Sequence, residues 1–571
     1  MKKYFLILII FIETNLILQE VKNCENFKNK NEINFFMDEK LNQHFIEEPK
    51  IILIYNGSLG NFNIIEIDQN FIITSISWTK KGDYIFNYLL GVFEGSNETS
   101  FMEGIPIGII KPKGELKEIN NIEINYPDTF KYIRYIPPNN NFTDISPIKI
   151  FGYEKNSNTF KNEKNFQVTN LPLISIHTEN SLEPIFWGGD LNCKIKIINE
   201  GKIELNEKAL IEVSGRTTGK FPPKKPYKIV FSTEQKILNF KNREKELYLL
   251  ANFFDRSLLR NSLALKISQL VELKYTPRCL HVDVIFNGNF RGNYYICEKI
   301  EIGKNKINIT KINNNDINEP NITGGYLLMI DNLLNYESGG YITKKGLRCA
   351  IIYPEEFEIT PEQETFIKYN LNKLENEIYN GILDSIDLDS YSKFFIIKEF
   401  CGDIDHIYSS FYFYKERNDD KFYFGPVWDF DTAFDNDKRL IPTNNKTDFC
   451  FNYGESSGTA RDLIKSLIRN KDVIEYIQKT WEKLCKFVLN EKILIDFIEE
   501  EKEKIKESGE LNFLKWDNIE KGQGRYDYLK FDYGRSQEEN FEVSIEILKD
   551  YIKKRFITFT NLINNAVLPY K

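Results

Sequence analysis

Two carboxylates separated by a single residue, Asp429 and Asp431, form the clearest candidate for metal chemistry in this chain. They follow the strand-like run 422–424 and a Gly-Pro break, and an extended backbone would point both side chains to the same side. Neighbouring carboxylates repel each other unless a cation lies between them or one is protonated. Hard divalent cations prefer carboxylate oxygens, and Mg²⁺ typically combines one or two of them with phosphate oxygens. The alternative is a solvated acidic turn, because Asp435 and Asp437 continue the acidity.

Asp405 lies about two dozen residues upstream, in a turn that precedes the strand-like run 411–414. An acidic turn before a strand, followed by a second acidic turn, matches the general layout of kinase active ends. There one Asp accepts the proton of the substrate hydroxyl, and the later Asp holds Mg²⁺ on the β- and γ-phosphates. The alternative is that Asp405 only caps a turn.

A strongly basic connection between two strand-like runs, from Ser214 to Phe231, is the second candidate. Its backbone N–H groups, Arg216 and a lysine next to the second strand could cradle phosphates. The Walker pattern G-x-x-x-x-G-K-[ST] is absent from it. For this connection alone, a basic β-hairpin on a solvated face is the better supported interpretation.

Two further segments place polar residues at the ends of predicted elements. Asp255 stands where it would cap an amphipathic helix, and Arg260 is either an inward ion-pair partner or a surface charge. The dipeptide Asn287-Gly288 between two apolar runs predicts a β-hairpin. Glu298 ends the second strand of that hairpin, where it would contact a nucleotide or be only an edge-strand charge.

The elements that must position these residues come in the order strands first, helices last. Up to about residue 161, short β-branched runs separated by Gly, Asn and Pro predict an antiparallel, β-sandwich-like module. A second series of strand-like runs begins at Leu171 and includes a helical segment near residues 255–273. Amphipathic helices are predicted over residues 473–489, 491–508 and 542–565. This order indicates an α+β fold rather than alternating βαβ units.

Length, charge and the N-terminus narrow the class of protein. The chain has 571 residues, enough for about two to four domains. Its net charge of −8 argues against a nucleic-acid partner, since such binding domains are usually strongly basic. A basic start followed by the apolar run 4–12 indicates a signal peptide, with a buried N-terminal strand as the alternative. No other stretch is apolar enough for a membrane span, so no stable span is expected after cleavage.

The cysteines and glycosylation sequons bear on the compartment. The eight cysteines form no C-x-x-C pair, which argues against zinc-finger and thioredoxin motifs. In the secretory route some would form disulfides, whose pairing the sequence does not reveal. Six N-x-S/T sequons agree with secretion: Asn56, Asn97, Asn141, Asn308, Asn321 and Asn445.

Taken together, these segments resemble the CotH kinase family, the spore coat protein H type, from about Leu171 to about Leu562. The motifs that carry the resemblance are LPLISIHT, SGRTTGKFPPKKPYKIVF, NFFDRSLLRN, VDVIFNGNFRGNYYICEKIEI, GGYLLMID, GDIDHIYSSFYFYK, GPVWDFD and EILKDYIKKRFITFTNLI. The resemblance implies an atypical protein-kinase-like fold with a β-rich N-lobe and a helical C-lobe. It further implies transfer of the γ-phosphate of ATP, with Mg²⁺ or Mn²⁺, to Ser or Thr of secreted, coat or surface proteins.

The resemblance also assigns roles to residues by position. It makes Asp405 the catalytic Asp, Asp429 the metal-binding Asp and Asp431 a second acidic ligand. Five residues after the catalytic Asp the family usually has an Asn that contacts metal, whereas this chain has Ser410, whose hydroxyl is a shorter and weaker ligand. The residues assigned to ATP are Gly215 and Arg216 in the phosphate loop, Lys225 as the favoured phosphate lysine, Lys228 as its alternative, and Glu298.

The predicted organisation is a signal peptide over residues 1–24, a β-rich accessory domain over 25–165 and a CotH kinase-like domain over 170–565. A secreted Ser/Thr protein kinase is the leading hypothesis. A non-catalytic, pseudokinase-like surface or coat protein is the alternative, favoured by Ser410 and by the extra module. A glycoside hydrolase ranks last, because Asp405 and Asp429 would have to lie about 5–10 Å apart in a sugar cleft.

Overall fold

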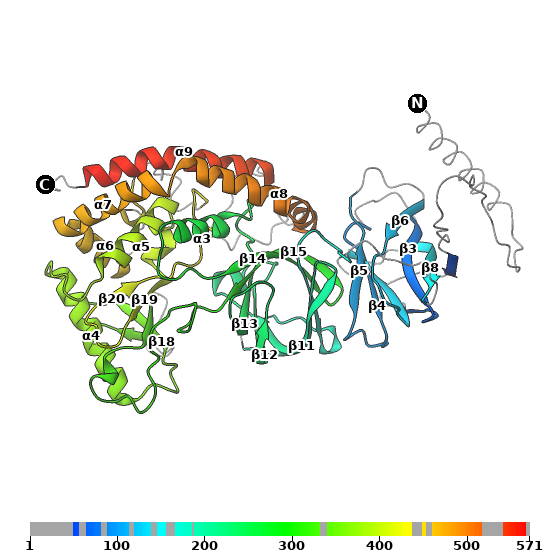
Figure 1. The fold of residues 1–571 in the computed structure, drawn as a ribbon, viewed down its shortest axis with the longest axis horizontal. Coiled ribbons are helices and arrows are strands. Elements are labelled where there is room, and N and C mark those ends of the chain that lie inside the picture. The colour runs from blue at the N-terminus through cyan, green and yellow to red at the C-terminus, as the bar shows by residue number, and fades with distance from the viewer. Residues whose placement is uncertain are drawn as a thin grey trace, which may run out of the picture. The chain divides into compact units, whose positions relative to one another are not determined.

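The computed structural model describes residues 50–55, 64–80, 88–112, 119–138, 145–155, 166–185, 188–331, 340–436, 448–452, 459–516 and 541–566. The predicted signal peptide lies outside these residues, as do Cys24, Asn56, Asn141 and Asn445. The fold is mixed α+β, with strands in the first part of the chain and long helices in the last part (Figure 1). No helix in the described ranges is both long and apolar enough to cross a membrane.

The N-terminal module consists of two antiparallel sheets with the strand orders β1-β8-β3-β6 and β2-β7-β4-β5. Their strands are β1 (Lys50–Tyr55), β2 (Ile64–Glu66), β3 (Phe71–Lys80), β4 (Val92–Ser96), β5 (Ile105–Ile109), β6 (Ile119–Glu123), β7 (Tyr132–Ile136) and β8 (Ile145–Glu154). Buried side chains of both sheets, among them Trp78, Phe93 and Ile148, belong to one core. Two antiparallel sheets over one core are the arrangement of a β-sandwich.

The next seven strands close into a barrel of order β10-β11-β12-β13-β15-β14-β9. They are β9 (Leu173–Thr178), β10 (Leu191–Asn199), β11 (Lys202–Val213), β12 (Tyr227–Lys236), β13 (Arg243–Leu250), β14 (Cys279–Phe286) and β15 (Asn289–Glu298). The barrel closes where β9 pairs in parallel with β14. Alternate apolar residues such as Ile211, Ile229 and Leu249 fill its interior. The other face of each strand is therefore free to contact the rest of the protein.

Buried contacts join the module to the barrel. Glu94 of β4 is fully buried and accepts hydrogen bonds from Nε and Nη2 of Arg134 on β7 (2.8 and 2.6 Å). His177 Nε2 of β9 lies 3.0 Å from the other carboxylate oxygen of Glu94. The chain from Pro49 to Lys571 forms one compact unit. The domain boundary between residues 165 and 170 accordingly stays a prediction from the sequence.

Acidification should weaken the contact at Glu94. Burial raises the pKa of Glu94, but the charges and hydrogen bonds of His177 and Arg134 outweigh it and lower the pKa from 4.5 to about 2. A carboxyl with a depressed folded-state pKa stabilises the fold above its unfolded pKa. Its contribution, on the order of 3 kcal/mol, should therefore be lost as the pH falls from 4.5 towards 2. Urea unfolding should show a smaller loss of stability on acidification in Glu94→Gln than in the wild type, and equal losses would contradict the assignment.

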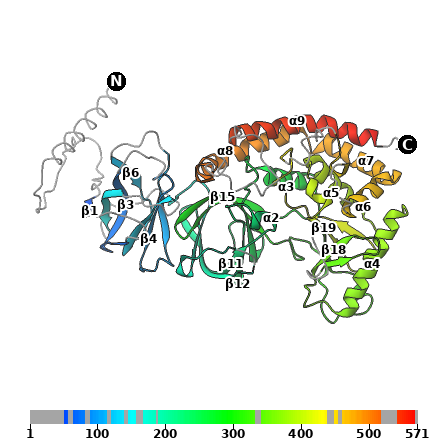
Figure 2. The same cartoon turned by 180° about the vertical axis from the view of Figure 1, so that it is seen from behind.

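The rest of the chain forms a five-stranded sheet, of order β17-β18-β16-β19-β20, with helices around it. Its strands are β16 (Tyr326–Ile330), β17 (Gly340–Ile342), β18 (Arg348–Tyr353), β19 (Phe411–Lys415) and β20 (Phe422–Phe424). The helices are α2 (Thr217–Lys220) in the barrel, then α3 (Arg260–Leu270), α4 (Pro361–Tyr379), α5 (Leu388–Cys401), α6 (Thr459–Arg469), α7 (Lys471–Phe487), α8 (Glu491–Trp516) and α9 (Phe541–Asn565). Helix α8 contacts both α9 and the barrel strand β15 (Figures 1 and 2).

Two local predictions can be compared directly with these elements. Asn287 and Gly288 both have positive φ (48° and 76°), as a two-residue type I′ hairpin requires, and the predicted hairpin is confirmed. Helix α3 starts later than predicted because Leu258 has a φ of 58°, which an α-helix excludes. Asp255 still serves the helix start, since its carboxylate accepts the N–H of Arg260 (2.8 Å). Arg260 is buried and pairs with Asp255, so it is the inward ion-pair partner.

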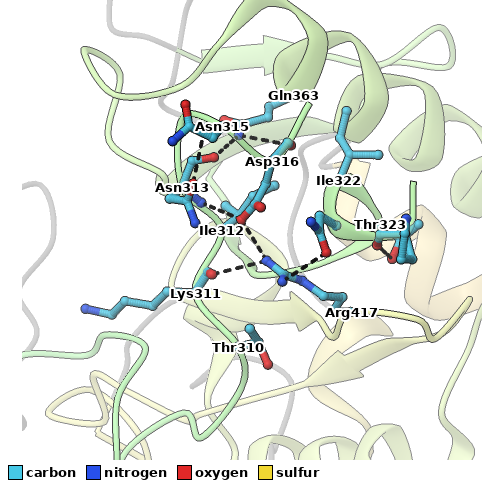
Figure 3. Close-up of polar contacts among 12 residues, drawn as sticks. Thr310, Lys311, Ile312, Asn313, Asn315, Asp316, Ile322, Thr323, Gln363 and Arg417 are labelled. Atoms are coloured by element: carbon cyan, nitrogen blue, oxygen red, sulfur yellow. Dashed lines mark hydrogen bonds and ion pairs between the residues drawn. The ribbon is translucent and has the colours of Figure 1, made fainter. Parts of the chain in front are cut away.

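The connection from β15 to β16 is fastened to two other parts of the fold (Figure 3). Arg417, which follows β19, donates to Asp316 Oδ2 (2.8 Å) and to the carbonyl of Lys311 (3.3 Å). Gln363, in the first turn of α4, donates to the carbonyl of Asn313 (2.7 Å). These contacts tie the chain that leaves the barrel to the five-stranded sheet and to α4.

Candidate active site

Asp405 lies in a tight turn after α5. Gly402 ends the helix in the left-handed conformation (φ 67°), and Asp403 caps the following 3₁₀ turn, Ile404–Ile407, by accepting the N–H of Asp405 (3.0 Å). The capping side chain is therefore that of Asp403. The partly exposed carboxylate of Asp405 lies 3.5 Å from the hydroxyl of Thr432, so it faces the segment that follows the WDFD motif.

The backbone around Asp429 is held from two helices. Asp429 has a φ of 67°, a conformation uncommon for a residue other than glycine, which surrounding contacts must maintain. Lys398 of α5 donates to the carbonyl of Trp428 (2.8 Å). Asn261 of α3 accepts the N–H of Phe430 (2.8 Å). These two hydrogen bonds grip the chain on either side of Asp429.

The chain just beyond Asp429 is anchored in the same way. Arg260 Nε donates to the carbonyl of Ala433 (3.0 Å), and Asn436 donates to the carbonyl of Asp431 (2.7 Å). The buried Arg260 and Asn261 thus position the WDFD turn from the start of α3.

The carboxylates at this end of the molecule act on one another. Burial, followed by the charges of Asp405 and Asp403, raises the pKa of Asp429 to about 7, whereas Lys398 lowers it. Burial, followed by the charge of Asp429, also raises the pKa of Asp431. Shifts of this direction arise where carboxylates lie near each other with too little positive charge between them. The hydrogen bond of Thr432, the residue after Asp431, to Asp405 agrees with this, so the turn of Asp405 lies beside the turn of Asp429 and Asp431.

A divalent cation suits these carboxylates. Oxygen ligands are those that Mg²⁺ and Mn²⁺ prefer, and a cation would relieve the repulsion within the cluster. Among the residues that the structure describes, no three His, Cys, Asp or Glu side chains are placed so that they enclose a metal. Mg²⁺ does not need such a cage, because it usually combines one or two carboxylates with waters and phosphate oxygens. Asp429 and Asp431 fit that kind of site.

Lys398 is a residue at this site that the sequence patterns do not indicate. Its side chain is fully buried, and its Nζ donates to Asp403 Oδ2 at 2.7 Å. The ammonium group also lies 4.2 Å from the ring centroid of Phe430. One side chain thus connects the turn of Asp405 with the WDFD motif. A lysine in the last turn of an apolar helix, five residues before an Asp, is the only sequence signal of this pair.

The basic loop between β11 and β12 contacts the end of the five-stranded sheet through an ion pair of Arg216. Gly215 has a φ of 72°, and a Cβ there would lie 2.3 Å from the hydroxyl of Thr218, so this turn requires glycine. Arg216 Nη1 forms an ion pair with Asp331 Oδ2 at 2.8 Å. Asp331 directly follows β16, at the end where β16 pairs with the first residue of β19. In the sequence, Asp331 stands out only as the last residue of the motif GGYLLMID.

Three lysines, Lys224 and Lys225 in this loop and Lys228 on β12, have different partners. Lys224 is buried and donates to Asn512 of α8 (2.8 Å). Lys225 donates to two carbonyls at the C-terminal end of α2 (2.9 and 3.1 Å). Lys228 forms an ion pair with Glu212, directly opposite on β11 (2.8 Å). In protein kinases the phosphate-contacting lysine also lies on a strand and pairs with a glutamate, although there the glutamate comes from a helix.

Lys228 lies on the barrel face that is turned towards the acidic cluster. Tyr248 is the cross-strand neighbour of Lys228, and its ring centroid lies 6.4 Å from that of Trp428. Burial, followed by the charge of Asp429, raises the pKa of Tyr412 on β19. Burial, followed by the charge of Glu246, raises the pKa of Tyr248, and Tyr412 contributes to the same shift. The ring contact places the Lys228 face of the barrel beside Trp428, the residue before Asp429.

Glu298 and Ser410 are placed less directly. Glu298 is buried, and its Oε1 accepts the hydroxyl of Tyr275 (2.9 Å) and the N–H of Arg278 (2.8 Å). These bonds hold the chain that enters β14, and the nucleotide contact of Glu298 stays a prediction. Ser410 is partly exposed, has a φ of 56° and immediately precedes β19. Its contact with metal also stays a prediction.

A family model described as CotH kinase protein matches residues 211–557, most of the chain. The chain belongs to the CotH kinase family. The matched range includes the Arg216 loop, the turn of Asp405 and the WDFD motif. Membership supports a kinase, a phosphotransferase, and such a family implies a nucleotide, a divalent cation and a protein substrate in general.

The other two comparisons add little. A search of the curated proteins finds no match. One solved structure, CBM62 from Clostridium thermocellum Xyl5A, is 23% identical and covers 15% of this chain and 61% of its own, with a TM-score of 0.14. At that TM-score the likeness supports no argument about fold or function.

Proposed function

We propose that this CotH kinase family protein is an ATP- and metal-dependent Ser/Thr protein kinase with an atypical kinase-like fold. The proposal is supported by the neighbouring turns of Asp405 and of Asp429 and Asp431, and by the ring contact that puts the barrel face of the Lys228–Glu212 pair beside Trp428. Phosphoryl transfer needs positioned acidic groups for metal and proton, and basic groups for the phosphates. In this proposal the barrel is the β-rich N-lobe, and the five-stranded sheet with its helices is the C-lobe.

The residues divide the work as follows in this proposal. Asp405, whose carboxylate is partly exposed, accepts the proton of the acceptor hydroxyl. Asp429 and Asp431 hold Mg²⁺ or Mn²⁺, which when bound neutralises phosphate charge. Arg216 exchanges its contact with Asp331 for a phosphate oxygen, and Lys228 donates to the phosphates while Glu212 orients it.

The direct test is phosphate transfer by the purified full chain. Incubation with labelled ATP and Mg²⁺ or Mn²⁺ should label Ser or Thr of an acceptor protein, and omission of the divalent cation should abolish the labelling. Absence of transfer, together with thermal stabilisation by ATP, would contradict the kinase and support a non-catalytic nucleotide-binding protein. The substitution of Ser410 for the usual Asn is the observation that favours that second candidate.

Two partly exposed lysines, Lys225 in the loop and Lys228 on β12, provide a matched pair of variants. Lys228→Met should raise the KM for ATP roughly 10- to 100-fold, because it removes a charge-assisted hydrogen bond to phosphate. Lys225→Met removes the same charge three residues away but only frees two backbone carbonyls of α2. It should change the KM for ATP by no more than a few-fold. The reverse result, measured by steady-state kinetics, would assign the phosphates to Lys225 instead.

We further propose that the protein acts in the secretory pathway or at the extracellular surface, on secreted, coat or surface proteins. The N-terminal basic and apolar pattern supports this, and three sequon asparagines in the described ranges, Asn97, Asn308 and Asn321, are exposed. Expression in a eukaryotic secretory system should yield glycosylated protein in the medium. Retention of the unprocessed chain inside the cells would contradict secretion.

A further inference from the structure

The cysteines Cys279 and Cys297 face each other across two neighbouring barrel strands. Cys279 begins β14 and Cys297 lies near the end of β15, and the antiparallel register pairs them directly. The Cys279 thiol donates to the carbonyl of Pro277 (3.9 Å), and the Cys297 thiol donates to the carbonyl of Tyr295 (3.6 Å). Of the seven cysteines that the structure describes, all are in the thiol form.

The backbone hydrogen bonds around the two cysteines show whether they form a hydrogen-bonded or a non-hydrogen-bonded pair of the antiparallel ladder. The N–H of Glu298 donates to the carbonyl of Arg278 (3.1 Å), one residue outside the pair on each strand. In an antiparallel ladder this marks the enclosed Cys279 and Cys297 as a non-hydrogen-bonded pair, whose Cα atoms lie about 4.5 Å apart and whose side chains approach most closely. Disulfides span Cα separations of about 4.4–6.8 Å. The register therefore holds the Cα atoms of the two cysteines at a separation that a disulfide can span.

The thiols share one face of the barrel. Strand neighbours alternate between the two faces, and Ile296 belongs to the barrel interior. Cys297 belongs instead to the core shared with the helices, against which Cys279 is packed. Cys279 is partly exposed and Cys297 is buried, so a small reagent would reach Cys279 first.

We infer that Cys279 and Cys297 form a cross-strand disulfide when the protein meets an oxidising thiol–disulfide pool. The inference is independent of whether the protein transfers phosphate. The oxidant is a low-molecular-weight disulfide of the glutathione class. The Cys279 thiolate attacks one of its sulfurs, forms a mixed disulfide and releases one thiol. Cys297 then attacks Cys279 Sγ and releases the second thiol, so one protein disulfide and two small thiols replace two protein thiols and one small disulfide.

The disulfide would lie at the end of a row of cross-strand neighbours that runs over the barrel strands to Lys228. Cys297 is the cross-strand neighbour of Tyr248, and Tyr248 is that of Lys228. A bond between β14 and β15 would restrict the unfolded chain and stabilise the side of the barrel on which this row lies.

The test equilibrates the purified full chain with reduced and then with oxidised glutathione, followed by alkylation, proteolysis and mass spectrometry. In oxidised buffer we expect one linked peptide pair that joins Cys279 to Cys297 and is lighter than the two free-thiol peptides by two hydrogens. The midpoint of thermal unfolding should rise by a few degrees on oxidation. Full alkylation of both cysteines in oxidised buffer, or linkage of either one to another cysteine, would overturn the inference.

Two variants separate this bond from general oxidation. Cys297→Ser should leave Cys279 as a glutathione adduct and abolish the rise in the unfolding midpoint. Cys485→Ser removes the other cysteine of the described ranges that is partly exposed, on α7, and should retain both the linked peptide and the rise. A rise that persists in Cys297→Ser, or one that disappears in Cys485→Ser, would count against the Cys279–Cys297 bond.

Discussion

Replacement of Asp405 by Asn should lower the kcat of phosphate transfer roughly 10²- to 10⁴-fold and leave the KM for ATP within a few-fold of the wild type. The amide has the shape of the carboxylate but cannot accept the proton of the acceptor hydroxyl. The folded protein should tolerate the change, because Asp405 is one of the like charges that raise the pKa of Asp429. Thermal unfolding without metal should therefore show equal or higher stability, so a loss of activity would not reflect unfolding.

Asp429→Asn provides the matched comparison for Asp405→Asn. Both variants remove one negative charge from the same cluster, but only Asp429 is proposed as a metal ligand. The concentration of Mg²⁺ that gives half-maximal rate should rise in Asp429→Asn and stay near the wild-type value in Asp405→Asn. Activity untouched in Asp429→Asn would refute the site. An equal change in metal requirement in both variants would make Asp405 a ligand rather than the proton acceptor.

Lys398→Met should destabilise the protein by about 3–5 kcal/mol, because it leaves the buried Asp403 without its cation. The Nζ of Lys398 also donates to the carbonyl of Trp428, so the turn that carries Asp429 loses one of its two anchors. Urea unfolding gives the free-energy change. The control is Lys393→Met on the same helix, whose partner Asp389 is exposed and whose loss should cost less than about 1 kcal/mol. Equal stabilities of the two variants would contradict the role of Lys398.

The double variant Lys398→Met/Asp403→Asn distinguishes folding from positioning. Removing both charges of a buried pair avoids an unpaired buried charge, so most of the lost stability should return. Phosphate transfer should stay low, because the carbonyl of Trp428 still lacks its donor. Recovery of stability and of wild-type kcat together would show that Lys398 serves only to fold the protein.

Local patterns were sufficient for the element types. The hairpin at Asn287-Gly288 needs positive φ at two adjacent residues, which these residue types supply. The amphipathic helices of the last part likewise follow from the spacing of their apolar residues. The main local error was the start of α3, where the left-handed conformation of Leu258 is imposed by packing and leaves no mark in the sequence.

The candidate site divides in the same way. Asp405 and the WDFD motif could be selected from the sequence because closely spaced carboxylates suit a divalent cation and because they match a family. The pairs that hold the site could not: Lys398 with Asp403, Arg216 with Asp331, and Lys228 with Glu212. Even the choice between Lys225 and Lys228 depends on which backbone or side chain each Nζ meets.

The physical reason is the range of each interaction. Secondary structure reflects contacts within a few residues, so composition and spacing carry it. Barrel closure joins β9 to β14, and the Arg216–Asp331 pair joins residues more than a hundred positions apart. Such pairings depend on the packing of the whole chain. The sequence by itself therefore named the acidic residues and their chemistry, and the tertiary structure decided which basic and positioning residues meet them.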